Sequence, residues 1–94
     1  MSAHGATAAR TIEDVCAALI AGGRDDDASV ILRASLGHDS AIVREAAVLG
    51  VVEIFGTRPW VADLLTRVLA DDPSSCVREA CRDGLYVIDP GDRR

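Results

Sequence analysis

The apolar residues of this 94-residue chain recur at helical spacing, and no segment alternates in the way that a β-strand does. Ile12, Val15, Cys16, Leu19 and Ile20 follow an i, i+3, i+4, i+7, i+8 pattern, which places them on one helix face. Patterns of this kind predict five helices, over residues 11–21, 26–36, 41–55, 59–70 and 73–89. Short connections make neighbouring helices antiparallel. We therefore expect a single all-α domain over 11–89, between a disordered segment at 1–10 and a tail at 90–94.

Capping signals support these helix ends. Thr11 is a plausible N-cap of the first helix, with Asp14 three residues later in the position of a capping box. The run of acids at 25–27 suits the positive end of the second helix dipole. Pro59 has the fixed φ that suits a first helical position. Glycines follow the first three predicted helices and end them.

The chain contains an internal repeat of 34 residues. In this register Val-Arg-Glu-Ala at 43–46 falls on the same four residues at 77–80, and Gly22 and Gly50 fall on Gly56 and Gly84. The second and third predicted helices form one unit, and the fourth and fifth form the next. The first helix aligns loosely with the second helix of a unit. We therefore expect two helix pairs preceded by a half-repeat that acts as an N-terminal cap.

The repeated block carries a resemblance to a known family. Residues 72–80 (Asp-Pro-Ser-Ser-Cys-Val-Arg-Glu-Ala) resemble the turn and second helix of a HEAT repeat, and most of all the short bacterial type called PBS-lyase HEAT-like. The resemblance covers about residues 25–89 and implies a short right-handed α-solenoid. It also implies a ladder between repeats in which Arg44 and Arg78 pair with turn carboxylates such as Asp72, while His38 stands at the Asp position of the first unit. The period also fits a tetratricopeptide repeat, but the Val-Arg-Glu-Ala block favours the HEAT-like type.

Equivalent helices of the two units differ in polarity. Val48, Leu49 and Phe55 of the third helix fall on Arg82, Asp83 and Asp89 of the fifth. A helix that is apolar nearly all round is buried, whereas a polar outer face indicates a terminal cap. We therefore expect the third helix to be buried and the fifth to close the solenoid, which would make the chain a complete short solenoid.

Composition and charge exclude several classes of protein. Aromatic residues make up only 3% of the chain, so its core must be aliphatic. All ten basic residues are arginines, and fifteen acids give a net charge of -5. An acidic domain repels nucleic-acid phosphates and anionic membrane surfaces, so neither is an expected partner. Residues 1–10 are small and polar and lack a hydrophobic core segment, so we expect no signal peptide, and an odd number of cysteines fits reduced thiols in a cytoplasm.

The residues that could carry chemistry form no recognised catalytic or metal-binding pattern. His4 and His38 lack a second ligand at metal spacing, and Cys16, Cys76 and Cys81 do not follow the spacing of a zinc site. The sequence has no Ser or Cys nucleophile with a spaced His and acid, and no phosphate-binding glycine loop. We therefore expect no metal, no cofactor and no enzymatic activity.

The expected function is that of a protein-interaction module or small scaffold that presents a helical surface. The candidate contacts are two aromatics and the charged residues of the last helix: Trp60, Glu79, Arg82, Asp83 and Tyr86. Trp60 has a second interpretation, as a packing residue at the start of its helix. Self-association is a further expectation, because a short stack leaves both ends weakly covered. The alternative is an accessory subunit of a lyase or another modifying enzyme.

Overall fold

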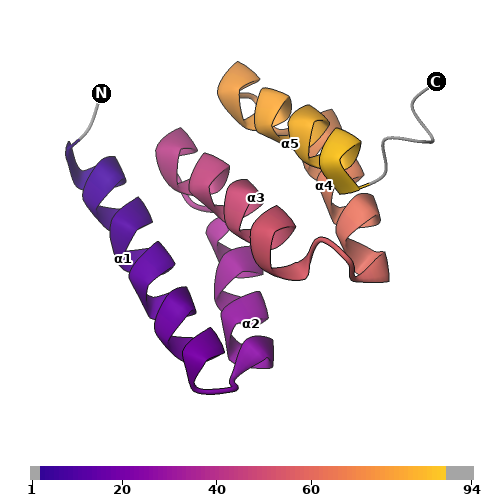
Figure 1. Ribbon diagram of the computed structural model, residues 1–94. Coiled ribbons are helices and arrows are strands. Elements are labelled where there is room, and N and C mark those ends of the chain that lie inside the picture. The colour runs from indigo at the N-terminus through magenta and orange to yellow at the C-terminus, as the bar shows by residue number, and fades with distance from the viewer. Residues whose placement is uncertain (1–2, 89–94) are drawn as a thin grey trace.

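The computed structural model describes residues 3–88, and this part of the chain contains helices and no strand (Figure 1). The expectation of an all-α protein is therefore confirmed for the described residues. The five helices are α1 (Ala3–Ala21), α2 (Asp25–Ser35), α3 (Ala41–Phe55), α4 (Pro59–Asp71) and α5 (Ser75–Ile88).

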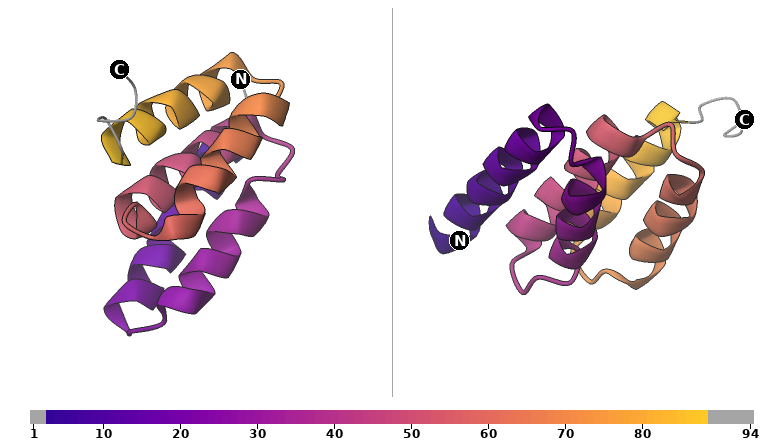
Figure 2. Two further views of the ribbon diagram at one scale, coloured as in Figure 1. Left: turned by 90° about the vertical axis from the view of Figure 1, so that its right-hand side faces the viewer. Right: turned by 90° about the horizontal axis from the view of Figure 1, so that it is seen from below.

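The helices form two layers. In the first layer α3 lies between α1 and α5 and packs against both (Figure 1). In the second layer α2 packs against α1 and α3, and α4 packs against α5 and, less extensively, α3 (Figure 2). The Cα atoms span 37 × 34 × 15 Å, so the molecule is a thin slab. Helices α2 and α4 cover one side of the α1–α3–α5 layer, and we call the opposite side its outer side.

Helix α1 begins at Ala3, eight residues before the predicted start at Thr11. Residues 3–10, which the sequence assigned to a disordered segment, are therefore helical. They include four alanines, the residue with the highest helix propensity, and no apolar periodicity that would reveal a helix. Thr11 is consequently inside the helix and is not its N-cap, and its Oγ1 donates a hydrogen bond to the Thr7 carbonyl at 3.0 Å.

The start of α1 is held by packing against the turn before α3. Gly5 and Ala9 are buried. A Cβ placed on Gly5 would lie 2.6 Å from Ser40 Oγ and 3.6 Å from Ile42 Cδ1, so a larger residue would force the Ser40 side chain to move. At the other end of the chain, α5 begins at Ser75 and not at Pro73. The predicted tail at 90–94 lies outside the described residues.

The core is aliphatic, as the composition predicted. Fully buried residues come from both layers and include Val43, Val51, Val61, Leu65 and Val77, each with 0% of its surface exposed. Phe55 is the one large aromatic side chain among the buried residues that the structure describes. The core therefore lies between the two layers and is centred on α3.

The sequence comparison predicted three residues of α3 to be buried, and the structure confirms two of them. Val48 and Phe55 are 0% and 2% exposed, respectively, but Leu49 is 53% exposed. The equivalent residues of α5, Arg82 and Asp83, are exposed, while Asp89 lies outside the described residues. Helix α3 is therefore buried on most of its circumference but open along the side that carries Leu49.

Candidate functional site

The turn between α4 and α5 is tied to α3 by a buried ion pair. Arg44 Nε lies 2.8 Å from Asp72 Oδ2, and Arg44 Nη2 lies 3.3 Å from Asp72 Oδ1. The two side chains are only 13% and 6% exposed. Arg44 Nη1 also donates to the carbonyls of His38 and Asp39, at 2.8 and 3.0 Å. This one guanidinium group therefore joins the turn before α3 to the turn before α5.

The two turns repeat the same hydrogen bonds 34 residues apart. The Ser74 amide donates to Asp72 Oδ1 at 2.9 Å, and the Ser40 amide donates to His38 Nδ1 at the same distance. Arg78 Nη1 donates to the Asp72 carbonyl at 2.9 Å, which matches the bond from Arg44 to the His38 carbonyl. The imidazole of His38 thus takes the local role of the carboxylate. The structure brings together the three residues proposed for the ladder, Arg44, Asp72 and Arg78.

The surroundings of Asp72 favour its charged form. Burial alone would raise the pKa of its carboxyl group, but the hydrogen bonds from Arg44 and the Ser74 amide, with the charges of Arg44 and Arg78, outweigh burial. The net effect is a pKa below the ordinary value of 3.8. Asp72 is therefore ionised at neutral pH and acts as a fixed structural anion.

The structure divides the residues proposed for partner binding. Trp60 lies on α4, half-buried, with its ring 3.8 Å from the guanidinium carbon of Arg33 and 5.6 Å from the ring of Phe55. This arrangement matches the packing interpretation of Trp60. The other four candidates lie on α5, in the first layer: Glu79, Arg82, Asp83 and Tyr86.

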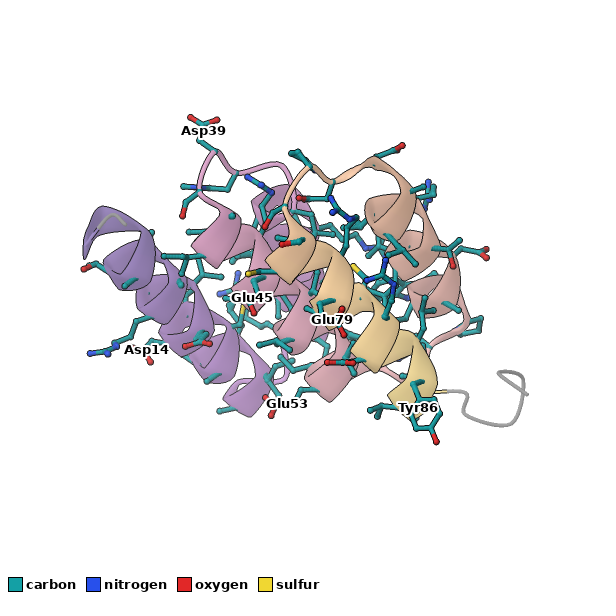
Figure 3. The ribbon with its side chains drawn as sticks, turned by 90° about the horizontal axis from the view of Figure 1, so that it is seen from above. Asp14, Asp39, Glu45, Glu53, Glu79 and Tyr86 are labelled. Atoms are coloured by element: carbon teal, nitrogen blue, oxygen red, sulfur yellow. The ribbon has the colours of Figure 1, made fainter. Side chains whose placement is uncertain are left out.

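On α5 these residues form an exposed polar strip. Arg82 Nη1 pairs with Glu79 Oε1 at 3.2 Å, and both side chains are more than half exposed. Tyr86 is 60% exposed near the end of the helix (Figure 3). An exposed ion pair of this kind contributes little to stability. The strip is exposed and therefore accessible to a partner.

A groove of about 680 Å³ lies on the other side of α3, between α3 and α1. Its lining from α1 has the spacing of one helix face, and so does its lining from α3, while Leu32 of α2 closes the floor. A Cβ placed on Gly50 would lie 3.0 Å from Leu32 Cδ2, so the glycine lets this leucine approach α3 closely. The lining residues are Glu13, Asp14, Ala17, Ile20, Ala21, Leu32, Ala46, Leu49, Gly50, Glu53 and Ile54.

The first layer is acidic on its outer side. Figure 3 shows this side, and its labelled carboxylates Asp14, Glu45, Glu53 and Glu79 come from all three helices of the layer. The sequence counts Arg44, Arg78 and Arg82 against these acids on the second-helix faces. In the structure the guanidinium groups of Arg44 and Arg78 instead bind the turns at one end of the layer, while Arg82 stays on the exposed face and pairs with Glu79.

Sequence reasoning did not identify the groove. Leu49 was predicted to be buried because the third helix is apolar nearly all round, whereas the equivalent residue of the fifth helix is the polar Asp83. Asp14 was interpreted as part of a capping box. The available signal was the small size of Ala17 and Ala21, which face α3 without the bulk needed to cover Leu49.

The three cysteines are free and differ in their surroundings. Burial, with a smaller contribution from the charge of Asp72, raises the pKa of the Cys81 thiol to about 11. Burial also raises the pKa of Cys16, while Cys76 is exposed at the start of α5. A thiol with a raised pKa is a poor nucleophile at neutral pH, so Cys16 and Cys81 act as small core residues.

Two further properties concern the described part of the chain. Among the described side chains of residues 5–88, no three His, Cys, Asp or Glu groups gather where they could hold a metal ion. None of the helices in residues 3–88 has the length and apolar character needed to cross a bilayer.

Comparison with known proteins does not assign the chain to a family. No protein-family model, no curated protein and no solved structure matches it. The function is therefore inferred from the geometry of the α1–α3–α5 layer and from the chemistry of its groove.

Proposed function

We propose that this protein is a non-enzymatic interaction module that binds another protein through the outer side of its α1–α3–α5 layer. The observation that carries this proposal is the groove between α1 and α3, where Leu49 is 53% exposed beside alanines and Ile54. A concave surface that is mostly apolar is the usual form of a binding site in proteins. Burying them on binding supplies a favourable free energy that is proportional to the apolar area removed from water.

We further propose that the scaffold is a short right-handed α-solenoid of the HEAT-like type, with α1 as a half-repeat cap. Three observations support this proposal. Helices α1, α3 and α5 lie side by side with α2 and α4 behind them. The turns at His38 and Asp72 repeat their hydrogen bonds 34 residues apart, and Arg44 of one unit pairs with Asp72 of the next.

This scaffold suits a binding role because it holds the groove in a fixed shape. The lining side chains lie on helices, and α3 is anchored through Arg44 to both turns. A surface organised before binding loses little conformational entropy when a partner arrives. The three free cysteines support a reducing compartment, and we propose a cytoplasmic location.

Site-specific photo-crosslinking in the source cells tests the proposed function. A photoreactive phenylalanine analogue replaces Leu49 in the groove or, as a matched control, Asp63, an exposed residue of α4 in the second layer. We expect one defined protein to be captured from position 49 and not from position 63. Its purified form should then bind the unmodified protein in solution.

The identity of the captured protein separates the alternatives. An enzyme whose turnover changes when the module binds would support the accessory-subunit alternative, whereas a second copy of this chain would support self-association through the layer. The same background of captured proteins from both positions would contradict the proposed function.

A further inference from the structure

The groove between α1 and α3 is about as long as two turns of a helix. Its lining runs from residue 13 to residue 21 along α1 and from residue 46 to residue 54 along α3. At 1.5 Å per residue each run is about 12 Å long, which equals a little more than two helical turns. A trough between two helices is a recurrent binding site for the apolar face of a third helix.

The floor of the groove selects apolar side chains. Leu49 and Ile54 of α3 and Ile20 of α1 provide the apolar surface, and Ala17 and Ala46 leave room above it. Leu49 is more than half exposed. An occupant that covers Leu49 must therefore offer aliphatic or aromatic side chains at i, i+3 or i+4, and i+7.

The rim of the groove carries negative charge on both sides. Glu13 and Asp14 stand on the α1 side and Glu53 on the α3 side, and no basic residue is part of the lining. Within residues 3–88, none of these three carboxylates takes part in an ion pair. A ligand with cationic groups beside its apolar face would complement the rim.

The arginines that could neutralise the rim from neighbouring helices are engaged elsewhere. Arg44 binds Asp72 and two turn carbonyls, and Arg78 binds the Asp72 carbonyl. Arg82 on α5 pairs with Glu79. Arg10 of α1 lies one turn before Asp14 and lines a small hollow with it, so the acidic character of the groove rests on Glu13 and Glu53.

We propose that the groove binds a cationic amphipathic helix of a partner protein, about two turns long, with Lys or Arg flanking its apolar stripe. The inference rests on the proposed function and specifies its partner. A second copy of the chain is a poorer occupant, because each copy carries a net charge of -5 and would bring like charge to the rim.

A designed peptide tests the inference without knowledge of the natural partner. The probe is a fluorescent 15-residue peptide with leucines at helical spacing and lysines at the remaining positions. One control peptide has glutamates in place of the lysines, and a second has the same composition shuffled so that the leucines share no helix face. We expect the first peptide to bind, the glutamate peptide not to bind, and the shuffled peptide to bind at least tenfold more weakly by fluorescence anisotropy.

Two adjacent substitutions locate the binding site. Ala17 and Ala18 are both exposed on α1, but only Ala17 lines the groove. Ala17→Arg places a long cation in the groove and should weaken peptide binding at least tenfold, whereas Ala18→Arg should leave the affinity unchanged. Both variants change the net charge equally, so a difference between them cannot come from overall charge.

A second pair of variants tests the rim. Glu13→Gln with Glu53→Gln removes two rim charges and should weaken binding severalfold, and added salt should have less effect on this variant than on the wild type. Asp26→Asn with Asp63→Asn removes two exposed charges from α2 and α4 and should not change the affinity. Thermal melts of all four variants establish that each is folded.

Several results would overturn the inference. They are equal affinity of the Ala17→Arg and Ala18→Arg variants, equal binding of the lysine and glutamate peptides, or no binding of the lysine peptide to the wild type. If crosslinking from position 49 captures a defined protein while the lysine peptide does not bind, the proposed function stands and this inference fails.

Discussion

The two flanks of α3 differ although each faces a helix of the same layer. Toward α5 the contact is close along most of its length, since a Cβ placed on Gly84 would lie 2.6 Å from Val52 Cγ2 and 3.2 Å from Leu65 Cδ1. A smaller hollow, of about 310 Å³, lies between the C-terminal ends of the two helices. Toward α1 the contact opens into the groove, and Leu49 is 53% exposed there. The same central helix therefore has a packed side and an open side.

Side-chain size accounts for much of this difference. In the 34-residue register Asp14, Ala17 and Ala21 of α1 fall on Val48, Val51 and Phe55 of α3. The three residues of α3 are buried, whereas the three of α1 are exposed. An acid and two alanines cannot fill the space that two valines and a phenylalanine fill, so α1 covers less of its neighbour.

The ion pairing of the two flanks differs as well. Arg44 joins α3 to the turn before α5 through Asp72. The equivalent residues on the α1 side are Arg10 and His38, and no ion pair between them is present in the described part of the chain. The closed flank is thus fastened by a buried charge pair, and the open flank is not.

The largest expected effect comes from placing a charge on the packed part of α3. Val48 is 0% exposed, so Val48→Arg would bury an unpaired cation, and the cost of several kcal/mol is comparable to the whole stability of a small domain. We expect this variant to be unfolded by circular dichroism. Leu49→Arg is the control on the next residue and should stay folded with a similar melting temperature. Equal melting temperatures of the two variants and the wild type would contradict the distinction.

The next effect comes from breaking the ion pair of the closed flank. Asp72→Ala leaves the buried Arg44 without its carboxylate, and we expect a loss of about 3 kcal/mol in chemical denaturation. Asp39→Ala is the control, because this exposed residue contacts Arg44 through its backbone carbonyl. A loss below about 1 kcal/mol for Asp72→Ala would mean that the pair does not fasten the flank.

Acid should reduce the same contribution. The folded pKa of Asp72 lies below the ordinary value of 3.8, so its stabilising effect is complete well above that pH and is lost as the pH falls through the folded pKa. The difference in unfolding free energy between the wild type and Asp72→Ala should therefore be largest near neutral pH and shrink toward pH 2. A difference that is constant over this range would contradict the role of the ionised carboxylate.

A smaller effect should come from adding a methyl group on each flank. Gly84→Ala pushes a Cβ against Val52, a β-branched side chain with little freedom to move, and we expect a net loss of about 1–2 kcal/mol. Gly50→Ala meets the flexible end of Leu32 at 3.0 Å, and the higher helix propensity of alanine, worth about 1 kcal/mol, offsets most of the cost. If urea denaturation shows a larger loss of unfolding free energy for Gly50→Ala than for Gly84→Ala, the α5 side of α3 is not the more tightly packed side.

The smallest effect should come from adding the missing carboxylate to the open flank. His38→Asp supplies an acid at the position equivalent to Asp72, and the 34-residue register makes Arg10 of α1 its expected partner. We expect a rise of a few degrees in the melting temperature, because exposed ion pairs contribute little. The rise should disappear in the Arg10→Met background. A rise that persists there would show that Arg10 is not the partner.

Much of the fold was predictable because apolar spacing and helix ends agree for most elements. The predicted bounds of α3 match the structure, and α2 and α4 differ by a residue at one or both ends. The early start of α1 was not predictable from periodicity, because Gly5 and Ala9 carry no apolar pattern. Gly5 is buried against Ser40 and Ile42, which are distant in the sequence.

The candidate site was less predictable for a related reason. Comparison of the two units indicated correctly that Val48 is buried, but Leu49 is the next residue along the chain and equally apolar. Whether a neighbour covers Leu49 depends on the size of the residues on α1. The orientation of Arg44 was only partly predictable from the sequence, because two of its acceptors are the backbone carbonyls of His38 and Asp39 and backbone groups leave no sequence pattern.

The central claim is that the open flank of α3 is the binding surface of this protein. Backbone amide chemical shifts, recorded by NMR while the leucine–lysine peptide is added, test it most directly. We predict that the shifts concentrate on residues 13–21 of α1 and 46–54 of α3, with little change in α4 and the outer face of α5. Shifts that concentrate on α4 or α5, or that spread evenly over the chain, would contradict the claim.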